Sequence, residues 1–474
     1  MTAKVDLLAI DRGLVVSPAG CGKTQLIADA LHAHTFAKPI LVLTHTNSGV
    51  AALRGRLDKA GVPASQYRLS TIDGWAIRLI STFPERSGHD PGIVTSQRPR
   101  YPTIRAAASR LLKSGHISDV IVASYSRLLV DEYQDCSGWQ HAIIYWAAKI
   151  LPTCVVGDPV QAIFDFSADD PICDWKKHVC VHFPQAGELS KPWRWLNAEA
   201  PELGEWLLAA RKNLLDGKPV DLRTAPSSVT WVKLEGNADD YGRMIKAGRV
   251  KPPGGSGSVL IIGESKSPPS QQRIASAIPG AITVEAVDLR DLVSFAESLD
   301  LSSSKAVATV AEFAESLMTN VGAADLVKRV DSLMRGKARR EASTVENAAI
   351  AFVRDPCLAH VLNLLVEINK DAGVRVYRPA ILRACIRALE LACGPGSISF
   401  GDAAVRIREQ GRVVGRTIKG RSVGSTLTLK GLEADVVVVL DAGTHNARNL
   451  YVAMTRGSKQ LIICSRNALL KPSW

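Results

Sequence analysis

Residues 17–24 read SPAGCGKT. The glycines of this stretch let backbone N–H groups crowd around phosphate oxygens, and Lys23 adds a cation beside them. An apolar run at residues 14–17 precedes the stretch, and residues 24–34 follow it with apolar side chains at helical spacing. A strand, a glycine-lysine loop and a helix in this order predict a phosphate-binding loop at a helix N-terminus.

A second stretch, residues 125–135, reads YSRLLVDEYQD and predicts an apolar strand that ends in two carboxylates. The Thr24 hydroxyl and the Asp131 carboxylate are oxygen ligands of the kind that Mg²⁺ prefers. Glu132 can orient and deprotonate an attacking water. Together the two stretches predict a site that hydrolyses ATP with Mg²⁺ as cofactor.

Composition bounds the class of protein. A chain of 474 residues is long enough for more than one core, because single cores stop growing near ~250–300 residues. No apolar run approaches the ~20 residues of a membrane helix, and the N-terminus lacks the pattern of a secretory signal. The nine cysteines contain no C-x-x-C pair, so we expect a reducing cytoplasm and neither a disulfide frame, a zinc site nor an iron–sulfur cluster.

Charge is compatible with nucleic acid as a partner. The formal net charge is +12 and the pI is near 9.3. Two local clusters stand out, RPRYPTIR at residues 98–105 and RGKARR at residues 335–340. Each can be a nucleic-acid contact or a solvated basic face, and the sequence leaves both interpretations open.

The first two hundred residues alternate between apolar runs and helical patterns. Strands are predicted at residues 14–17, 40–44, 128–131 and 154–157. This alternation favours an α/β fold with a parallel sheet covered on both faces. Residues 83–118 interrupt it as an insertion, which ends in a short helix at residues 104–113.

The second half repeats the α/β pattern after a connector at residues 216–228. Strands are predicted at residues 229–234, 259–262, 436–440 and 461–464, with a helical insertion over about residues 289–412. We therefore predict a first lobe at residues 1–215 and a second at residues 216–474.

Further strings follow the two ATP motifs in a fixed order. They are LTHTNSGVAALRGRL at 43–57, CVVGDPVQAIFDF at 154–166, WRWLN at 193–197, STLTLKGLEAD at 425–435 and LYVAMTRGSK at 450–459. Over nearly the whole chain this set resembles the superfamily 1 DNA helicases of the UvrD/Rep/PcrA type. The resemblance implies two RecA-like lobes with parallel sheets, each interrupted by a short, mostly helical insertion, with ATP held between the lobes.

The resemblance also implies roles for the residues around the phosphates. Gln161 carries an amide that can contact both the γ-phosphate and the attacking water. Arg194 from the first lobe and Arg456 from the second would neutralise charge on the transferring phosphoryl group. The predicted catalytic set is Lys23, Glu132, Gln161, Arg194 and Arg456, with Thr24 and Asp131 on the metal.

Nucleotide binding extends beyond the catalytic set. Trp193 stands where the family stacks an aromatic on adenine, although a buried packing tryptophan is the alternative. Glu433 matches a position that is implied to touch the ribose, and Gly431 belongs to the same string, KGLE. The complete predicted nucleotide-binding set is Ser17, Pro18, Ala19, Gly20, Cys21, Gly22, Lys23, Thr24, Gln25, Trp193, Arg194, Gly431, Glu433 and Arg456.

A track for single-stranded DNA is implied on the first lobe. His45, Thr46 and Asn47 match a strand-contacting loop, and Thr71 lies in a similar segment. Phe164 and Phe166 fall where the family places aromatics against bases, and such stacking is worth roughly 1–3 kcal/mol per base. For Phe164 a position in the core is an equal alternative. Stacking does not distinguish ribose from deoxyribose, so RNA stays open as a substrate.

The chain also departs from the family pattern. No glutamine-bearing adenine motif precedes the phosphate loop, so the preference for ATP over other triphosphates stays open. Leu427 replaces a histidine that contacts the strand and couples the lobes, and His45 replaces an aromatic. These departures leave hydrolysis intact and bear on duplex unwinding.

The sequence therefore predicts an ATP-dependent helicase or translocase moving 3′→5′ on single-stranded or forked DNA. One alternative is a DNA-stimulated sensor or translocase subunit for a partner nuclease, as in phage-defence pairs, which does not separate strands by itself. Another is a non-motor module that nucleotide locks in shape, which the presence of Glu132 and Gln161 disfavours. DNA repair, a mobile element and phage defence all remain open as pathways, with a nuclease or repair protein as partner.

Overall fold

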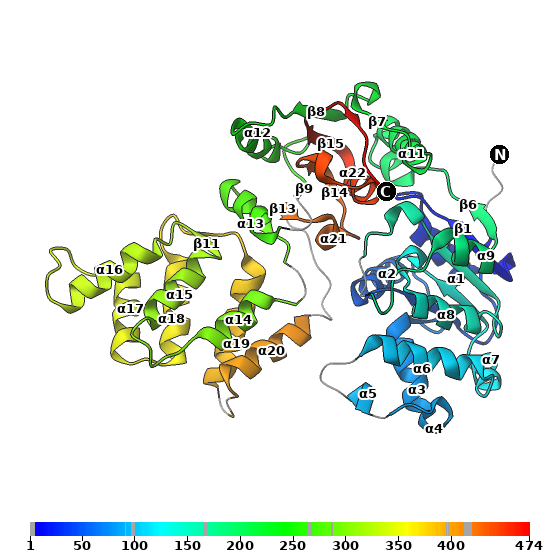
Figure 1. Cartoon of the computed structure of the whole chain (residues 1–474), viewed down its shortest axis with the longest axis horizontal. Coiled ribbons are helices and arrows are strands. Elements are labelled where there is room, and N and C mark those ends of the chain that lie inside the picture. The colour runs from blue at the N-terminus through cyan, green and yellow to red at the C-terminus, as the bar shows by residue number, and fades with distance from the viewer. Residues whose placement is uncertain are drawn as a thin grey trace. The chain divides into compact units, whose positions relative to one another are not determined.

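The computed structural model describes residues 5–90, 92–95, 100–164, 168–263, 267–285, 288–394, 396, 398–411 and 420–474. These residues form two compact units (Figure 1). Residues 1–233 and 442–474 belong to the first unit, and residues 234–441 belong to the second. The predicted first lobe ends at residue 215. The two compact units do not test this boundary, which stays a prediction.

The first unit is built on a parallel sheet of six strands in the order β3-β2-β4-β5-β1-β6. The strands are β1 (Arg12–Val16), β2 (Ile40–Thr44), β3 (Tyr67–Thr71), β4 (Arg127–Val130), β5 (Thr153–Gly157) and β6 (Gln185–Glu188). The unit also contains the parallel pair β8 (Val229–Lys233) and β15 (Gly457–Ser465), and the short antiparallel pair β7 (Val220–Asp221) and β16 (Leu469–Leu470).

Side chains alternate between two cores on the faces of this sheet. Leu14 and Val16 of β1 pack with Leu128 and Val130 of β4 on one face. Val15 packs with residues of the other face, among them Leu129. Successive side chains of a strand point to opposite faces, so a wholly apolar strand requires helices on both sides.

The helices of the first unit connect and cover the strands. They are α1 (Lys23–Ala33), α2 (Asn47–Lys59), α3 (Ile72–Thr82), α4 (Pro84–Ser87), α5 (Gly92–Thr95), α6 (Tyr101–Lys113), α7 (Ser118–Ser124), α8 (Gly138–Ala147), α9 (Cys180–His182), α10 (Trp193–Leu196), α11 (Pro201–Leu215) and α22 (Ala447–Met454). The predicted insertion at residues 83–118 corresponds to α4, α5 and α6 and reaches the start of α7.

The second unit combines a parallel sheet with a helical insertion. Its sheet strands run in the order β10 (Ala281–Thr283), β13 (Arg421–Gly424), β9 (Val259–Ile262) and β14 (Ala434–Val439). Next to them in the chain lie α12 (Asp239–Gly248), α13 (Pro268–Ala277) and α21 (Thr426–Leu429). A second parallel sheet confirms the predicted α/β class with two RecA-like lobes.

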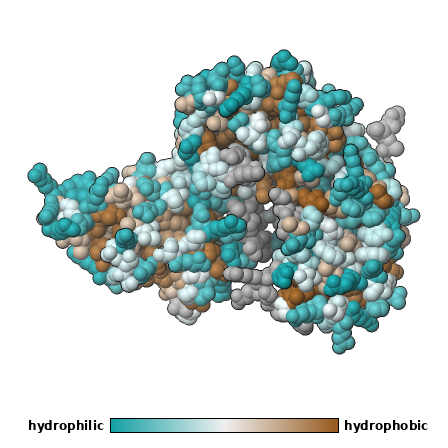
Figure 2. All heavy atoms as spheres, viewed as in Figure 1, coloured by the Kyte–Doolittle hydropathy of each residue, from teal (hydrophilic) through white to brown (hydrophobic). Residues whose placement is uncertain are grey.

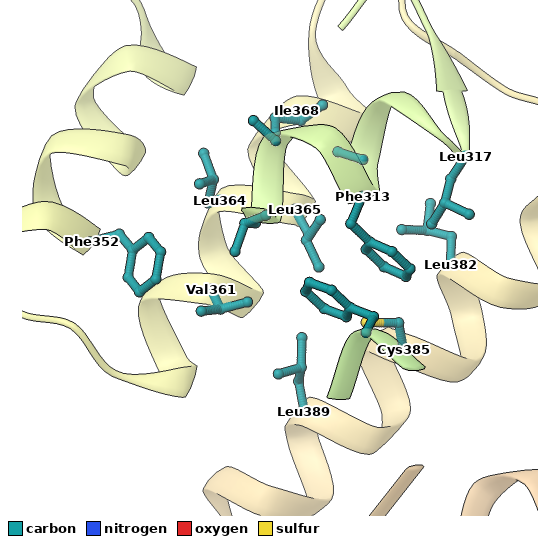
Figure 3. Close-up of a cluster of buried hydrophobic side chains, with 14 of the residues drawn as sticks. Phe313, Leu317, Phe352, Val361, Leu364, Leu365, Ile368, Leu382, Cys385 and Leu389 are labelled. Atoms are coloured by element: carbon teal, nitrogen blue, oxygen red, sulfur yellow. The ribbon is translucent and has the colours of Figure 1, made fainter. Parts of the chain in front are cut away.

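The insertion has a hydrophobic core of its own (Figure 3). Its helices are α14 (Arg290–Ser298), α15 (Ala306–Glu315), α16 (Ala323–Met334), α17 (Thr344–Arg354), α18 (Leu358–Lys370), α19 (Pro379–Cys393) and α20 (Phe400–Gly411), with the short pair β11 (Met318–Thr319) and β12 (Arg375–Val376). Phe295 and Phe313 stack with ring centroids 3.8 Å apart in this core. The core makes residues 290–411 a small helical body within the unit.

The basic cluster at residues 335–340 follows α16, where hydrophilic side chains cover the surface (Figure 2). Arg335 pairs with Asp331 at 2.9 Å and Arg340 pairs with Glu346 at 3.1 Å. At least part of this cluster is therefore paired within the insertion. No helix of the described ranges is both long enough and apolar enough to span a membrane.

Candidate nucleotide site

Five strands of the first sheet deliver the predicted motifs to one edge. The phosphate loop follows β1, His45 follows β2, α3 begins after Thr71 at the end of β3, Asp131 follows β4, and Gln161 follows β5 in a short 3₁₀ turn (Pro159–Gln161). The carboxyl ends of parallel strands share an edge, and ligands of open α/β sheets bind there. Segments that lie far apart in the sequence are therefore neighbours in the fold.

The phosphate loop has the backbone that its glycines predict. Gly20 and Gly22 have φ angles of 71° and 89°, a region that residues with a side chain rarely adopt. Gly22 is the N-cap of α1, so the first free N–H groups of that helix face the loop. Cys21 between them is buried, and burial raises the pKa of its thiol to about 12, which keeps it neutral.

Lys23 lies against both predicted carboxylates. Its Nζ is 3.0 Å from Asp131 Oδ1 and also donates to Glu132 Oε1. Burial works against the charge of Lys23, yet Asp131 and Glu132 beside it raise the pKa of the ammonium group. Burial raises the pKa of Asp131, while Lys23 opposes that shift. The lysine and the two carboxylates thus form one coupled charge cluster.

Glu132 is held in an unusual backbone conformation. Its φ of 55° and ψ of 40° place it in the left-handed region, which costs of order 1–3 kcal/mol for a residue with a side chain. Its Oε2 accepts a hydrogen bond from Gln134 Nε2 at 2.5 Å. Strain of this kind gathers at functional sites, and here it holds the predicted general base beside Lys23.

Thr24 has a partner that the sequence analysis did not select. Arg56 on α2 donates from Nη1 to Thr24 Oγ1 at 2.7 Å. Arg56 lies in the 43–57 string, on the helix that follows β2. The carboxyl end of β2 lies at the same edge of the sheet as the phosphate loop, and this position was the signal that could have selected Arg56. The arginine adds a cation next to the predicted metal-ligating hydroxyl.

The side chains of Gln161 and Arg456 contact each other. Arg456 Nη2 donates to Gln161 Oε1 at 3.5 Å, and both side chains are buried. Gln161 Nε2 donates to Asp158 Oδ2 at 3.0 Å, and Asp158 in turn pairs with Arg211 at 2.9 Å. A buried polar network therefore fixes the orientation of the predicted water-positioning amide.

Arg194 joins this group through its backbone and its side chain. Its N–H donates to the carbonyl of Gly20 at 3.0 Å, and its guanidinium donates to the carbonyl of Thr455, the residue before Arg456. Arg194 thus contacts the phosphate loop, and both predicted arginines lie within the first compact unit.

Two tryptophans support the loop from α10. The indole of Trp193 is 43% exposed and lies beside Gly22, with Lys191 Nζ 3.7 Å from its ring centroid. This exposure fits the predicted stacking role better than the buried alternative. Trp195, which the sequence analysis did not select, is buried behind Gly20 and donates to the Gly457 carbonyl at 2.8 Å.

The remaining loop residues have mainly structural contacts. Ala19 donates its N–H to the hydroxyl of Tyr451 at 3.2 Å, and Gln25 donates to Asp29 at 2.8 Å. Ser17 Oγ is buried and has no hydrogen-bond partner among the residues that the structure describes. An unpaired buried hydroxyl facing the loop, the open N-terminus of α1 and the oxygen pair of Thr24 and Asp131 suit a metal-bound triphosphate.

The predicted DNA track is brought together in part. His45 and Phe164 pack with ring centroids 5.1 Å apart, and both are half-buried. The hydroxyls of Thr46 and Thr71 cap α2 and α3 by accepting from Gly49 and Gly74.

Four further predicted residues have fewer described contacts. Asn47 is the exposed first residue of α2, and Phe166 lies outside the described residues. Gly431 and Glu433 are exposed and lie in the second compact unit, so their predicted contact with ribose stays a prediction.

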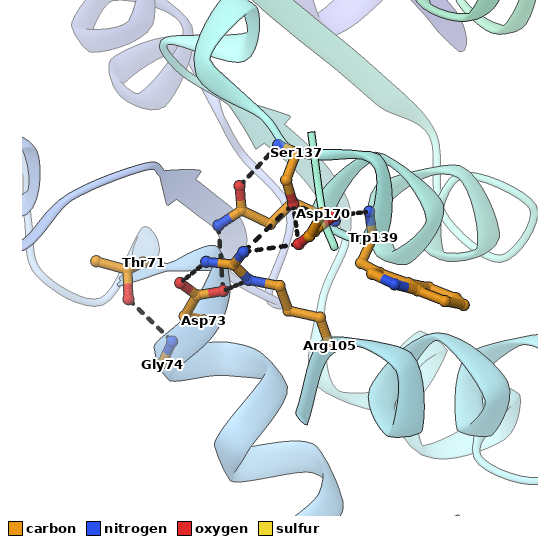
Figure 4. A network of polar contacts seen from close by, with 8 residues as sticks. Thr71, Asp73, Gly74, Arg105, Ser137, Trp139 and Asp170 are labelled. Atoms are coloured by element: carbon orange, nitrogen blue, oxygen red, sulfur yellow. Dashed lines mark hydrogen bonds and ion pairs between the residues drawn. The ribbon is translucent and has the colours of Figure 1, made fainter. Parts of the chain in front are cut away.

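The last arginine of the basic stretch at residues 98–105 has a structural role. Arg105 is buried and pairs with Asp73 at 2.7 Å and with Asp170 at 2.8 Å (Figure 4). Asp170 also accepts from the hydroxyl of Ser137, the N-cap of α8. Arg105 is therefore an internal tie between α3, α6 and α8, and not a nucleic-acid contact.

The comparisons with known proteins follow this geometry. Residues 103–172 match the family model of the UvrD/REP helicase N-terminal domain. A search of curated proteins found no match. Among solved structures, a complex of arterivirus nonstructural protein 10, a helicase, with DNA aligns over 96% of this chain and 60% of that chain. The identity is 10% and the TM-score is 0.36, a distant likeness.

The matched segment runs from α6 through Asp131 and Glu132 to Gln161 and beyond, and so contains the predicted base and water-positioning amide. The remaining motifs of the resemblance precede or follow it in the expected order. Residues 103–172 are therefore similar to the UvrD/REP helicase N-terminal domain.

Proposed function

We propose that this protein is an ATP-dependent motor that moves 3′→5′ on single-stranded DNA and separates strands at a fork. The observation that carries the proposal is a chain of contacts. Arg194 contacts Gly20 of the phosphate loop and the Thr455 carbonyl, and Arg456, the next residue, contacts Gln161. Two arginine forks and an oriented amide suit phosphoryl transfer, and a site that only bound nucleotide would need none of them.

The proposed division of labour follows from the chemistry of each group. Lys23 binds the β- and γ-phosphates once these oxygens replace its carboxylate partners. Mg²⁺, when bound by Thr24 and Asp131, supplies charge that offsets the phosphates. Glu132 removes a proton from the attacking water, which Gln161 orients. Arg194 and Arg456 stabilise the charge that develops on the transferred group.

DNA binds in this proposal along the edge that carries His45 and Phe164. Their paired rings offer faces for stacking, which tolerates any base and therefore suits a sliding motor. His45 lies one residue from Thr46, which caps α2, and α2 also carries Arg56 beside Thr24. A strand bound at these rings thus acts on a helix that touches the nucleotide site.

The first experiment measures phosphate release by the full chain with and without single-stranded DNA. Lys23→Ala should abolish the DNA-stimulated release, because the variant lacks the cation that holds the transferred phosphate. Lys59→Ala, on the exposed end of α2, is the matched control and should behave as wild type. DNA-stimulated release that survives in Lys23→Ala would refute the assignment of the active site.

A second candidate function is a DNA-stimulated sensor or translocase for a partner nuclease. Leu427 favours it, because an exposed leucine stands where the resemblance expects a strand-contacting histidine. A fork-unwinding assay on the purified protein separates the two candidates. Strand separation supports the helicase, whereas hydrolysis without separation supports the sensor.

A further inference from the structure

The loop between α17 and α18 brings together three side chains with metal-ligating atoms. Asp355, Cys357 and His360 each offer one such atom, and all three atoms lie within 4.8 Å of one another. Cys357 Sγ is 3.4 Å from His360 Nδ1, His360 Nδ1 is 3.5 Å from Asp355 Oδ2, and Cys357 Sγ is 3.9 Å from that same oxygen. A thiol, an imidazole and a carboxylate thus occupy the corners of one small triangle.

These distances match the edges of a tetrahedral zinc site. Bond lengths of about 2.3 Å to sulfur and about 2.0–2.2 Å to nitrogen and oxygen give edges of roughly 3.4–3.6 Å. The three measured separations differ from these edges by a few tenths of an ångström at most. An ion at the centre would need the His360 ring to exchange its hydrogen bond with the Asp355 carbonyl for the metal.

The backbone of the loop is already ordered by the helices on either side. Asp355 donates its N–H to the Ala351 carbonyl at 3.0 Å, and His360 donates its N–H to the Cys357 carbonyl at 3.1 Å. Phe352, one turn before Asp355, and Val361, directly after His360, are buried in the helical core (Figure 3). The loop is thus a preformed support, which reduces the entropy that a ligand must remove on binding.

We propose that Asp355, Cys357 and His360 bind a Zn²⁺ ion, with a water molecule as the fourth ligand. Thiolate and imidazole ligands select zinc over Mg²⁺ and Ca²⁺, which prefer oxygen. The sequence predicted no zinc site because it contains no C-x-x-C pair. The ligands proposed here follow a different pattern, D-x-C-x-x-H, which that criterion does not detect.

Zinc binding also changes the protonation of His360 and Cys357. His360 Nδ1 lies 2.7 Å from the Asp355 carbonyl, so in the metal-free loop this nitrogen is the N–H donor. Zinc takes the lone pair of Nδ1, so the ring proton shifts to Nε2, and the Cys357 thiol loses its proton to solvent. The bound ion then holds the start of α18 to the segment that follows α17, a structural role.

The test uses the full chain, stripped of metal, under reducing conditions and without nucleotide. Co²⁺ serves as the visible probe, because a tetrahedral cobalt site with a thiolate ligand has strong d–d bands and a sulfur-to-metal charge-transfer band. Wild type should develop these bands at one equivalent, and Zn²⁺ should bleach them. Cys357→Ser and His360→Gln should weaken Zn²⁺ binding at least about 100-fold, since even outer-shell changes cost 10–100-fold.

Matched variants control the result. Cys180→Ser, a half-buried thiol in the first compact unit, should bind cobalt as wild type does. In chelator, Cys357→Ser and His360→Gln should unfold at the wild-type temperature, and Zn²⁺ should raise that temperature only in wild type and Cys180→Ser. Cobalt bands that fail to appear in wild type, or that persist in Cys357→Ser, overturn the site.

Discussion

Gly20 is the residue of the phosphate loop whose replacement the structure constrains most. Its φ is 71°, and a Cβ added there would lie 2.6 Å from the buried ring of Trp195. Gly61 has nearly the same φ, 69°, with nothing within 4 Å of an added Cβ. The two positions therefore share the backbone strain and differ in the steric clash.

Gly20→Ala should accordingly lose far more than Gly61→Ala. Both substitutions incur the left-handed strain of about 1–2 kcal/mol. Only Gly20→Ala must also displace Trp195, and overpacking typically costs a further 1–3 kcal/mol. Chemical denaturation and binding of a fluorescent ATP analogue measure the two effects. Equal losses in the two variants would show that Trp195 does not restrict the loop.

Arg456 presents a planar fork to Gln161, and lysine cannot reproduce that geometry. Arg456→Lys should lower the turnover number for DNA-stimulated ATP hydrolysis by about 10³-fold, the low end of the range for transition-state arginines. Affinity for ATP should change much less. Arg466→Lys, at an exposed position, is the control for charge and should keep wild-type turnover. A turnover number for Arg456→Lys within tenfold of wild type would remove Arg456 from the catalytic set.

Residues at motif positions were predictable because their roles follow from local order along the chain. Lys23 and Glu132 follow strands whose carboxyl ends share an edge, so their proximity could be expected. Arg56 and Trp195 could not be selected in this way. Their contacts with Thr24 and Gly20 depend on how α2 and α10 pack, and a single sequence does not encode that packing in any periodic pattern.

At the scale of elements, buried strands were easier to predict than edge strands. The limits of β2 and β9 agree with the predicted runs at residues 40–44 and 259–262. These strands were predictable because all of their residues are apolar except Thr44 at the end of β2. β3 (YRLST) and β6 (QAGE) lie at the two edges of the first sheet, and neither was predicted. Edge strands face solvent and carry polar residues, so hydrophobic periodicity does not mark them.

The Arg105 network ties three helices of the first unit and should contribute strongly to its stability. Arg105→Ala leaves the Asp73 and Asp170 carboxylates without their buried cation, which typically costs about 3–5 kcal/mol. Arg335→Ala removes an exposed pair with Asp331 and should cost less than about 1 kcal/mol. Hydrogen exchange of peptides from α3 and α8 reports the first effect. Unchanged protection of these peptides in Arg105→Ala would show that the network does not stabilise the first unit.

At the scale of the whole molecule, the two compact units divide the predicted chemistry unevenly. All of the predicted catalytic residues lie in the first unit, whereas the proposed zinc ligands lie in the second. Each unit has its own hydrophobic core, so conditions that loosen one need not loosen the other. Acid is such a condition, because the first unit contains a histidine cluster around the buried His141.

His141 on α8 is the centre of that cluster. Its Nδ1 lies 2.8 Å from the Tyr133 hydroxyl and its Nε2 lies 2.7 Å from His182 Nδ1, with His178 close by. Burial, and then the charges of His182 and His178, lower the pKa of His141 to about 4. The folded unit therefore keeps His141 neutral down to a pH at which the unfolded chain, with an ordinary pKa near 6.5, is already protonated.

The stability of the first unit should therefore be complete above about pH 6.5 and fall as the pH drops toward about 4. Proton uptake by the unfolded chain over that window amounts to about 2 kcal/mol at about pH 5. Hydrogen exchange of α8 peptides between about pH 5 and 8, corrected for intrinsic rates, measures the loss. His141→Asn lowers protection at every pH because Tyr133 loses its partner, but it should flatten this dependence. His116→Gln, at an exposed position, should leave the slope unchanged, and an equally steep slope in His141→Asn would exclude His141 as the titrating group.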